Sequence, residues 1–126
     1  KISLDCYKSQ IFVIATPTTT HLQIIESILS RHSPELIICE KPIVSNLEQL
    51  KKLNKIVSQT KTKLITNFPR RFEPTLNKVK NIILESKEQY HFYGTFTKGL
   101  IHNGSHLIDL IAMLIGNIKN INYIYG

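Results

Sequence analysis

Residues 36–42 read LIICEKP, and this stretch decides the fold. The short continuous apolar run at residues 36–39 is typical of a buried β-strand. The run leads directly into Glu40, Lys41 and Pro42, so the strand delivers a cation to its carboxyl end. Ligands of open α/β sheets bind at the carboxyl ends of the strands. The stretch therefore predicts a buried strand that places Lys41 at a ligand-binding rim.

The elements on either side of this stretch alternate between strands and helices. Residues 11–15 (IFVIA) and 63–66 (KLIT) predict two further strands, the first of which ends at Thr16 and Pro17. Two helices are predicted between the strands, each opened by a capping box: Thr20 with Gln23 for a helix that ends near residue 32, and Ser45 with Glu48 for a helix that ends near residue 60. Such alternation indicates an α/β fold with parallel strands and right-handed crossovers.

The pattern changes at residues 67–72 (NFPRRF), where we place a domain boundary. Four elements are predicted beyond it: a helix over residues 74–86 with Pro74 in its first turn, β structure over 90–97, a helix over 105–115 ended by Gly116, and a final strand over 121–125.

Composition limits the function classes. The 126 residues carry a net charge of +7, but most of the lysines are dispersed over the polar faces of the predicted helices. A solvated surface explains this pattern better than a nucleic-acid footprint, which needs a contiguous cationic patch. No apolar run reaches the ~18 residues that a membrane span requires. We therefore expect no nucleic-acid partner and no membrane partner; salt-dependent DNA binding would test the alternative.

Two cysteines, Cys6 and Cys39, bear on the cellular compartment. They have no short metal-binding spacing, and Cys39 ends a strand that we expect to be buried. Two free thiols in a reducing compartment are expected, which predicts a cytoplasmic protein. A disulfide between them is the alternative.

Three phrases together resemble the Gfo/Idh/MocA family of nicotinamide-dependent oxidoreductases: Glu40-Lys41-Pro42, TPTTTH at residues 16–21 and GSHLID at residues 104–109. The resemblance covers nearly the whole chain. It implies a dehydrogenase that uses NAD or NADP to transfer a hydride to or from a hydroxyl or keto carbon of a sugar or cyclitol. It also implies a homo-oligomer when the protein is full length, assembled through the open sheet of the second domain.

No G-x-G-x-x-G phosphate loop occurs in the sequence, whose glycines all lie at residue 94 or later. Residues 1–66 are therefore predicted to be the second half of a Rossmann-like dinucleotide-binding domain. Residues 67–126 are predicted to begin a C-terminal α/β substrate and oligomerisation domain. We expect the full-length protein to be the enzyme and the 126-residue fragment alone to be inactive.

On the cofactor side, the resemblance implies roles for six residues. Lys41 would lie between nicotinamide and substrate as the catalytic cation, and its bond to Pro42 is often cis in the family. Glu40 would face the cofactor, or else form a plain surface pair with the lysine. Thr16 and Pro17 would lie along the cofactor, mainly through their backbone. His21 would join them, or serve only as a helix-start residue.

On the substrate side, His106 is the candidate acid/base, because an imidazole titrates near neutral pH and the start of a helix favours its neutral form. The family commonly has Asp four residues earlier, where this chain has His102. That change indicates either a different substrate, such as one with a carboxylate, phosphate or amide, or a lost activity.

Three further residues are substrate-side candidates. Asn103 would supply amide contacts. Asp109 would orient the histidine or bind substrate, or be an ordinary first-turn acid. Arg71 would clamp an acidic substrate, or form a salt bridge at the domain junction.

No metal site is expected, because the five histidines show no ligand spacing. The alternative to an enzyme is a non-catalytic or truncated member of the same scaffold that binds a sugar ligand or regulates.

Overall fold

The computed structural model describes residues 10–86, 88–116, 118–120 and 122. The chain divides into two compact units, Lys1–Asn67 and Phe68–Gly126, and each is described by itself.

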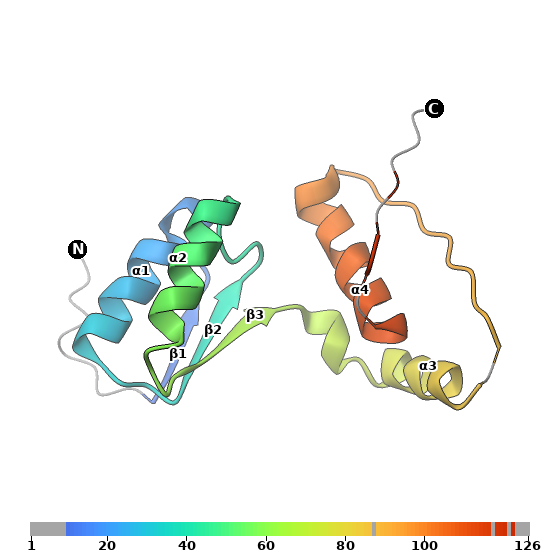
Figure 1. Cartoon of the computed structure of the whole chain (residues 1–126), viewed down its shortest axis with the longest axis horizontal. Coiled ribbons are helices and arrows are strands. Elements are labelled where there is room, and N and C mark those ends of the chain that lie inside the picture. The colour runs from blue at the N-terminus through green and yellow to red at the C-terminus, as the bar shows by residue number, and fades with distance from the viewer. Residues whose placement is uncertain (1–9, 87, 117, 121, 123–126) are drawn as a thin grey trace. The chain divides into compact units, whose positions relative to one another are not determined.

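The first unit is built around a three-stranded parallel sheet with the order β1-β2-β3 (Figure 1). Its elements are β1 (Ile11–Ile14), α1 (Thr18–Arg31), β2 (Leu36–Glu40), α2 (Leu47–Val57) and β3 (Lys63–Asn67). The register pairs Ile14 with Cys39 and Ile38 with Ile65. The predicted α/β fold with parallel strands is confirmed.

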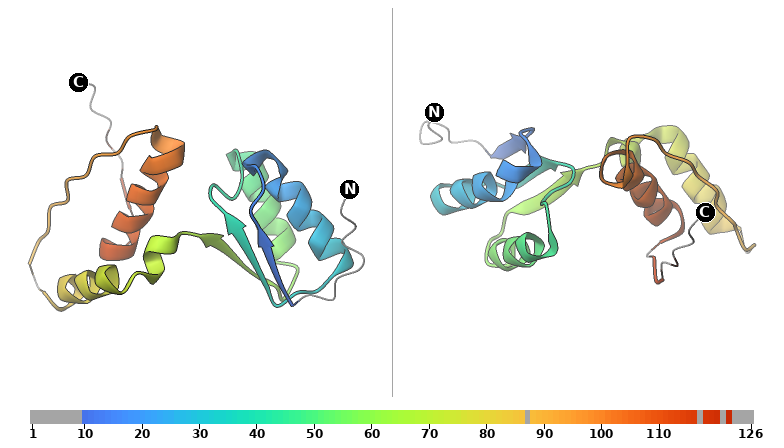
Figure 2. Two further views of the ribbon diagram at one scale, coloured as in Figure 1. Left: turned by 180° about the vertical axis from the view of Figure 1, so that it is seen from behind. Right: turned by 90° about the horizontal axis from the view of Figure 1, so that it is seen from above.

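Both helices of this unit cover the same face of the sheet (Figures 1 and 2). Because side chains alternate along a strand, every second residue points toward the helices. Ile14, Ile37 and Cys39 are buried there and form the core with Ile25 and Ile28 of α1 and Leu53 of α2. The intervening residues face the other way, and Val13 is 69% exposed.

Helix α1 begins two residues earlier than its predicted capping residue. Pro17 stands at the N-cap with a φ of −59° and Thr18 is already helical. Thr20 lies inside the first turn and its hydroxyl donates to the Pro17 carbonyl at 2.7 Å, so it does not serve as the N-cap as predicted. Pro17 occupies the N-cap in place of Thr20 because its ring fixes a φ that suits the start of a helix.

The side-chain cap of α2 forms one residue later than predicted. Asn46 Oδ1 accepts from the Gln49 backbone N–H at 2.9 Å, and Gln49 Oε1 accepts from the Ser45 N–H at 2.9 Å. Asparagine caps a helix as well as serine does. In a capping box the glutamine would accept from the N–H of Asn46, the N-cap residue itself, whereas here it accepts from the residue before it. The prediction of a side-chain cap was right, but the prediction of a capping box between Ser45 and Glu48 was wrong.

Within its described residues, the second unit has four helical elements: η2 (Pro69–Phe72), α3 (Pro74–Glu85), η3 (Leu100–Gly104) and α4 (Ser105–Ile115). Pro74 opens α3, and Gly116 ends α4 with a φ of 93°. Both predictions are confirmed. The π-helical turn η3, which leads into α4, had no signal in the sequence analysis.

Residues 90–97 form no strand, so the prediction of β structure there was wrong. A strand needs a hydrogen-bonded neighbour, and this segment has no ladder partner among the described residues. Tyr93 is 95% exposed. The final strand predicted over 121–125 lies outside the described residues except at residue 122.

Two glycines bring this extended segment against η3 and α4. A Cβ added at Gly94 would lie 2.8 Å from Leu107 Cδ1, and one added at Gly104 would lie 3.0 Å from the Phe96 ring. A side chain at either position would have to displace one of these neighbours, and glycine avoids this. Residues 94–97 therefore run along the start of α4.

Across the described part of the chain, no helix is both long enough and apolar enough to cross a membrane.

Candidate functional site

The first unit offers a rim at the carboxyl ends of its strands. Strand β1 leads into Thr16 and Pro17, which are exposed, and β2 leads into Lys41 and Pro42, which are half-buried. Because β1 and β2 are adjacent and parallel, both connections begin at the same edge of the sheet. The peptide bond between Lys41 and Pro42 is cis, as the family resemblance implied.

His21 links the two connections at this rim. Its Nε2 lies 2.8 Å from the Thr16 carbonyl oxygen and its Nδ1 lies 3.1 Å from the Pro42 carbonyl oxygen. The residue is only 1% exposed. Its side chain therefore holds the β1 connection to the β2 connection and presents no surface to a ligand, in contrast to the expectation of a cofactor contact.

Glu40 also connects the ends of two neighbouring strands through a hydrogen bond. Its Oε1 accepts a hydrogen bond of 2.6 Å from Asn67 Nδ2, which joins the end of β2 to the end of β3. The carboxylate is thus oriented by the neighbouring strand. The sequence analysis considered Lys41 as the partner of Glu40 and did not predict the hydrogen bond from Asn67.

Cys39 lies beneath the rim as a free, fully buried thiol. Burial, and then the negative charge of Glu40, raise the pKa of Cys39 to about 11. The thiol is therefore neutral and packs as an apolar group.

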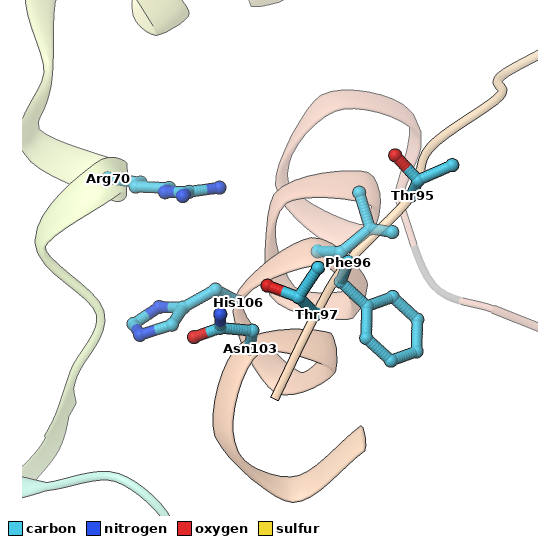
Figure 3. A pocket seen from close by; sticks show the side chains of 7 residues that line it. Arg70, Thr95, Phe96, Thr97, Asn103 and His106 are labelled. Atoms are coloured by element: carbon cyan, nitrogen blue, oxygen red, sulfur yellow. The ribbon is translucent and has the colours of Figure 1, made fainter. Parts of the chain in front are cut away.

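The second unit contains a cavity of about 270 Å³ next to His106 (Figure 3). Three segments line it: Arg70 from η2, Thr95, Phe96 and Thr97 from the extended segment, and Asn103, His106 and Leu107 from η3 and α4. The figure shows Arg70, Asn103 and His106 around one space, with the extended segment alongside α4. The lining combines polar side chains with the apolar Phe96 and Leu107, and it contains a histidine, a residue type suited to proton transfer.

His106 stands in the first turn of α4, as predicted. The Phe68 ring lies edge-on to its imidazole, with centroids 5.9 Å apart and planes at 89°. An edge-to-face contact of this kind is favourable and fixes ring orientation. The histidine is therefore oriented by the residue that precedes η2 as well as by its own helix.

Arg71 and Asp109 pair with each other. Arg71 Nε lies 2.9 Å and 3.0 Å from the two carboxylate oxygens, and Nη2 lies 2.6 Å from Oδ1. The hydrogen bond to Asp109 raises the pKa of Arg71. This bidentate pair fastens η2 to α4 one turn beyond His106, so it positions the cavity wall.

Of the remaining substrate-side candidates, the structure places only Asn103 in the cavity. His102 is exposed and is not among the lining residues; its carbonyl accepts from the Ser105 hydroxyl at 2.9 Å. Sequence analysis missed Arg70, Thr95 and Thr97. Adjacent arginines in a turn carry no signal of which one faces a cavity, and the alternating threonines were attributed to a strand.

No group of three or more metal-ligating side chains comes together among the described residues.

Comparison with known proteins agrees with this architecture. A family model described as "Oxidoreductase family, NAD-binding Rossmann fold" matches residues 3–68, more than half of the chain. The match and the parallel sheet define the first unit as part of a NAD-binding Rossmann domain of an oxidoreductase. The chain belongs to the Gfo/Idh/MocA family.

Two known proteins are similar in sequence to part of the chain. The chain is 42% identical over 71 residues to inositol 2-dehydrogenase of Rhizobium meliloti (strain 1021), a match that covers 56% of the chain and 21% of that protein. It is 34% identical over 71 residues to the rhizopine catabolism protein MocA of Rhizobium meliloti, covering 56% and 22%. The chain thus spans about a fifth of the length of these relatives.

A solved structure extends the likeness to the second unit. The crystal structure of a putative myo-inositol dehydrogenase from Sinorhizobium meliloti 1021 matches with a TM-score of 0.68 and 29% identity. That match covers 84% of this chain and 36% of the other.

Proposed function

We propose that the whole protein is an NAD(P)-dependent dehydrogenase that oxidises a hydroxyl carbon of a sugar or cyclitol, or reduces the corresponding ketone. The observation that carries the proposal is the cavity beside His106, with polar side chains in its lining, at the start of α4, where the sequence reads GSHLID. The 42% identity to an inositol 2-dehydrogenase supports a polyol substrate.

The residues at the rim of the first unit fit the cofactor of this family. Thr16 and Pro17 are exposed at the end of β1, and Lys41 follows β2 at the same edge. This edge is where dinucleotides bind in open parallel sheets. Thr16, Pro17, Glu40, Lys41 and Pro42 would hold the cofactor, whether NAD or NADP, and His21 would hold their connections in place. Hydride transfer is the chemistry that a bound nicotinamide supplies.

The chain's own residues would handle the proton and the charge. His106 would take the hydroxyl proton of the substrate while the hydrogen on the substrate carbon leaves as a hydride. An alcohol and an oxidised cofactor would thus become a ketone, a reduced cofactor and a proton. Lys41 would stabilise the negative charge that develops on the substrate oxygen. Asn103 would orient the substrate within the cavity.

The proposal includes an assembly and a location. The whole protein would form a homo-oligomer, as the family resemblance implies, and residues 67–126 would begin the domain responsible. The free thiol of Cys39 supports a reducing compartment such as the cytoplasm.

A second candidate is a non-catalytic member that binds a sugar ligand. The observation in its favour is His102, which replaces the Asp that the family commonly has four residues before its histidine. Such a protein would bind a polyol without turning it over.

The experiment is a reduced-nicotinamide absorbance assay of the complete gene product with NAD or NADP and a panel of sugars and inositols. We expect turnover, and we expect Lys41→Met and His106→Asn to lower kcat by about 10²–10⁴-fold. The surface change Lys55→Met on α2 is the matched control for the first variant and should leave kcat unchanged. If a sugar or inositol binds but no combination of cofactor and substrate is turned over, the result would favour the non-catalytic sugar-binding protein.

A further inference from the structure

The cavity beside His106 is surrounded by basic and neutral groups. Its lining contains Arg70 and His106 as basic residues, with Asn103, Thr95 and Thr97 as neutral polar ones. No carboxylate is among the described residues that line it. A cavity with this lining favours an anion over a neutral or cationic ligand.

The two adjacent arginines of η2 differ in their surroundings. Arg71 is neutralised by Asp109, whose two oxygens both accept from it. Among the described residues, no acidic side chain pairs with Arg70. Asp109 of α4 is therefore already paired with Arg71, and the positive charge of Arg70 at the cavity is not balanced by it.

We infer that the cavity takes a monosaccharide-sized polyol that carries an anionic group, a carboxylate or a phosphate, and that Arg70 binds this group. The inference rests on the proposed function, whose substrate class it narrows. A guanidinium binds either anion through two parallel hydrogen bonds. The volume of about 270 Å³ lies just below the ~300 Å³ at which drug-sized sites begin, so it suits a small ligand.

The neighbours of Arg70 complete the site. The Thr95 and Thr97 hydroxyls and the Asn103 amide supply donors and acceptors for ring hydroxyls. The bidentate pair of Arg71 with Asp109 fixes the turn that carries Arg70. The anionic group would thus fix the polyol with one ring hydroxyl toward His106.

The test measures binding as well as turnover, on the complete gene product. The probes are D-glucose, D-glucuronate and D-glucose 6-phosphate, which share a ring and differ at one carbon. Isothermal titration with each probe, in the presence of NAD and then of NADP, gives Kd for the wild type, Arg70→Gln, Arg70→Lys and Lys78→Gln. The last variant removes one charge from the exposed face of α3 and is the matched control.

We expect one anionic probe to bind at least about tenfold more tightly than D-glucose, since a charge-assisted hydrogen bond is worth about that factor or more. Arg70→Gln should abolish the difference, Arg70→Lys should keep part of it, and Lys78→Gln should keep all of it. Whichever anionic probe binds more tightly identifies the group as carboxylate or phosphate.

Three results would overturn the inference: D-glucose binding as tightly as both anionic probes, equal effects of Arg70→Gln and Lys78→Gln, or no binding of any probe. A different result would contradict the proposed dehydrogenase function while keeping the inference: an anionic probe binds through Arg70, but no probe is turned over with either cofactor.

Discussion

Replacing His21 by leucine tests whether the two connections at the rim depend on one buried ring. His21 faces the Thr16 carbonyl through one nitrogen and the Pro42 carbonyl through the other. Leucine fills a similar volume but donates no hydrogen bond. The substitution therefore removes the link while it keeps most of the packing around a residue that is 1% exposed.

The magnitude follows from the number of hydrogen bonds. A neutral imidazole has one N–H and donates to one of the two carbonyls at a time, whereas a doubly protonated ring donates to both. A buried acceptor that loses its partner costs about 1–3 kcal/mol. We expect the free energy of unfolding to fall by that amount, and the connection that carries Lys41 to become more mobile.

The assay is hydrogen–deuterium exchange of the complete gene product, read at residues 43–46. The Ser45 N–H, which donates to Gln49, reports opening of the connection after Pro42. We expect exchange there to become about 10- to 100-fold faster, since each 1.4 kcal/mol of lost opening energy is a factor of ten. Because Lys41 lies in the same connection, kcat should fall as well.

Two further variants separate this effect from general destabilisation. Ile25→Val removes one methylene from a fully buried residue of the same helix and should cost about 0.5–1.5 kcal/mol without touching either connection. His21→Gln supplies an amide donor and should recover part of the protection. The reasoning is refuted if His21→Leu exchanges like the wild type, or if Ile25→Val opens residues 43–46 as much.

Three other predictions follow from single contacts. Because burial raises the pKa of Cys39 to about 11, the folded protein in a Cys6→Ser background should not react with a thiol reagent at pH 8 until it is denatured; the same shift makes stability fall as pH rises from the ~8.5 of an unfolded thiol toward 11, and rapid labelling of the folded protein would contradict it. Gly104→Ala would place a methyl group 2.9 Å from Leu100 and 3.0 Å from the Phe96 ring, so overpacking of about 1–3 kcal/mol should exceed the ~1 kcal/mol gained in helix propensity and lower the midpoint of thermal unfolding; an unchanged midpoint would show that the side chains yield freely. Asp109→Asn should weaken the anchor of η2 on α4 by about 1 kcal/mol, a modest value because the Arg71 side chain is 46% exposed, and should raise KM for the substrate more than Asn81→Ala on the exposed face of α3 does; equal KM values in the two variants would rule out a role in positioning the cavity.

Much of the first unit could be predicted because its signals are local. Residues 36–39 form a strand since they are a short apolar run before a proline, and residues 47–57 form a helix because their apolar residues recur at helical spacing. The errors concern which of several neighbouring residues occupies the N-cap of a helix. Pro17 displaced Thr20 and Asn46 displaced Ser45, because each competing residue suits the backbone at its position equally well or better.

The second unit was harder to predict because its features depend on distant partners. Residues 90–97 have the composition of a strand, yet a strand exists only where another one pairs with it. Arg70 and Arg71 are indistinguishable in the sequence, and the position of Asp109 decides that the second forms the ion pair while the first lines the cavity.

The sequence by itself determined the α/β alternation, the rim that carries Lys41, and His106 at the start of a helix, because periodicity and helix-capping chemistry act over a few residues. Only the tertiary structure decided that His21 joins two connections, that Glu40 is held by Asn67, and that Arg70 faces the cavity. The hydrogen bonds of His21 to Pro42 and of Glu40 to Asn67 join groups 21 and 27 residues apart in the chain, and only folding brings such groups together.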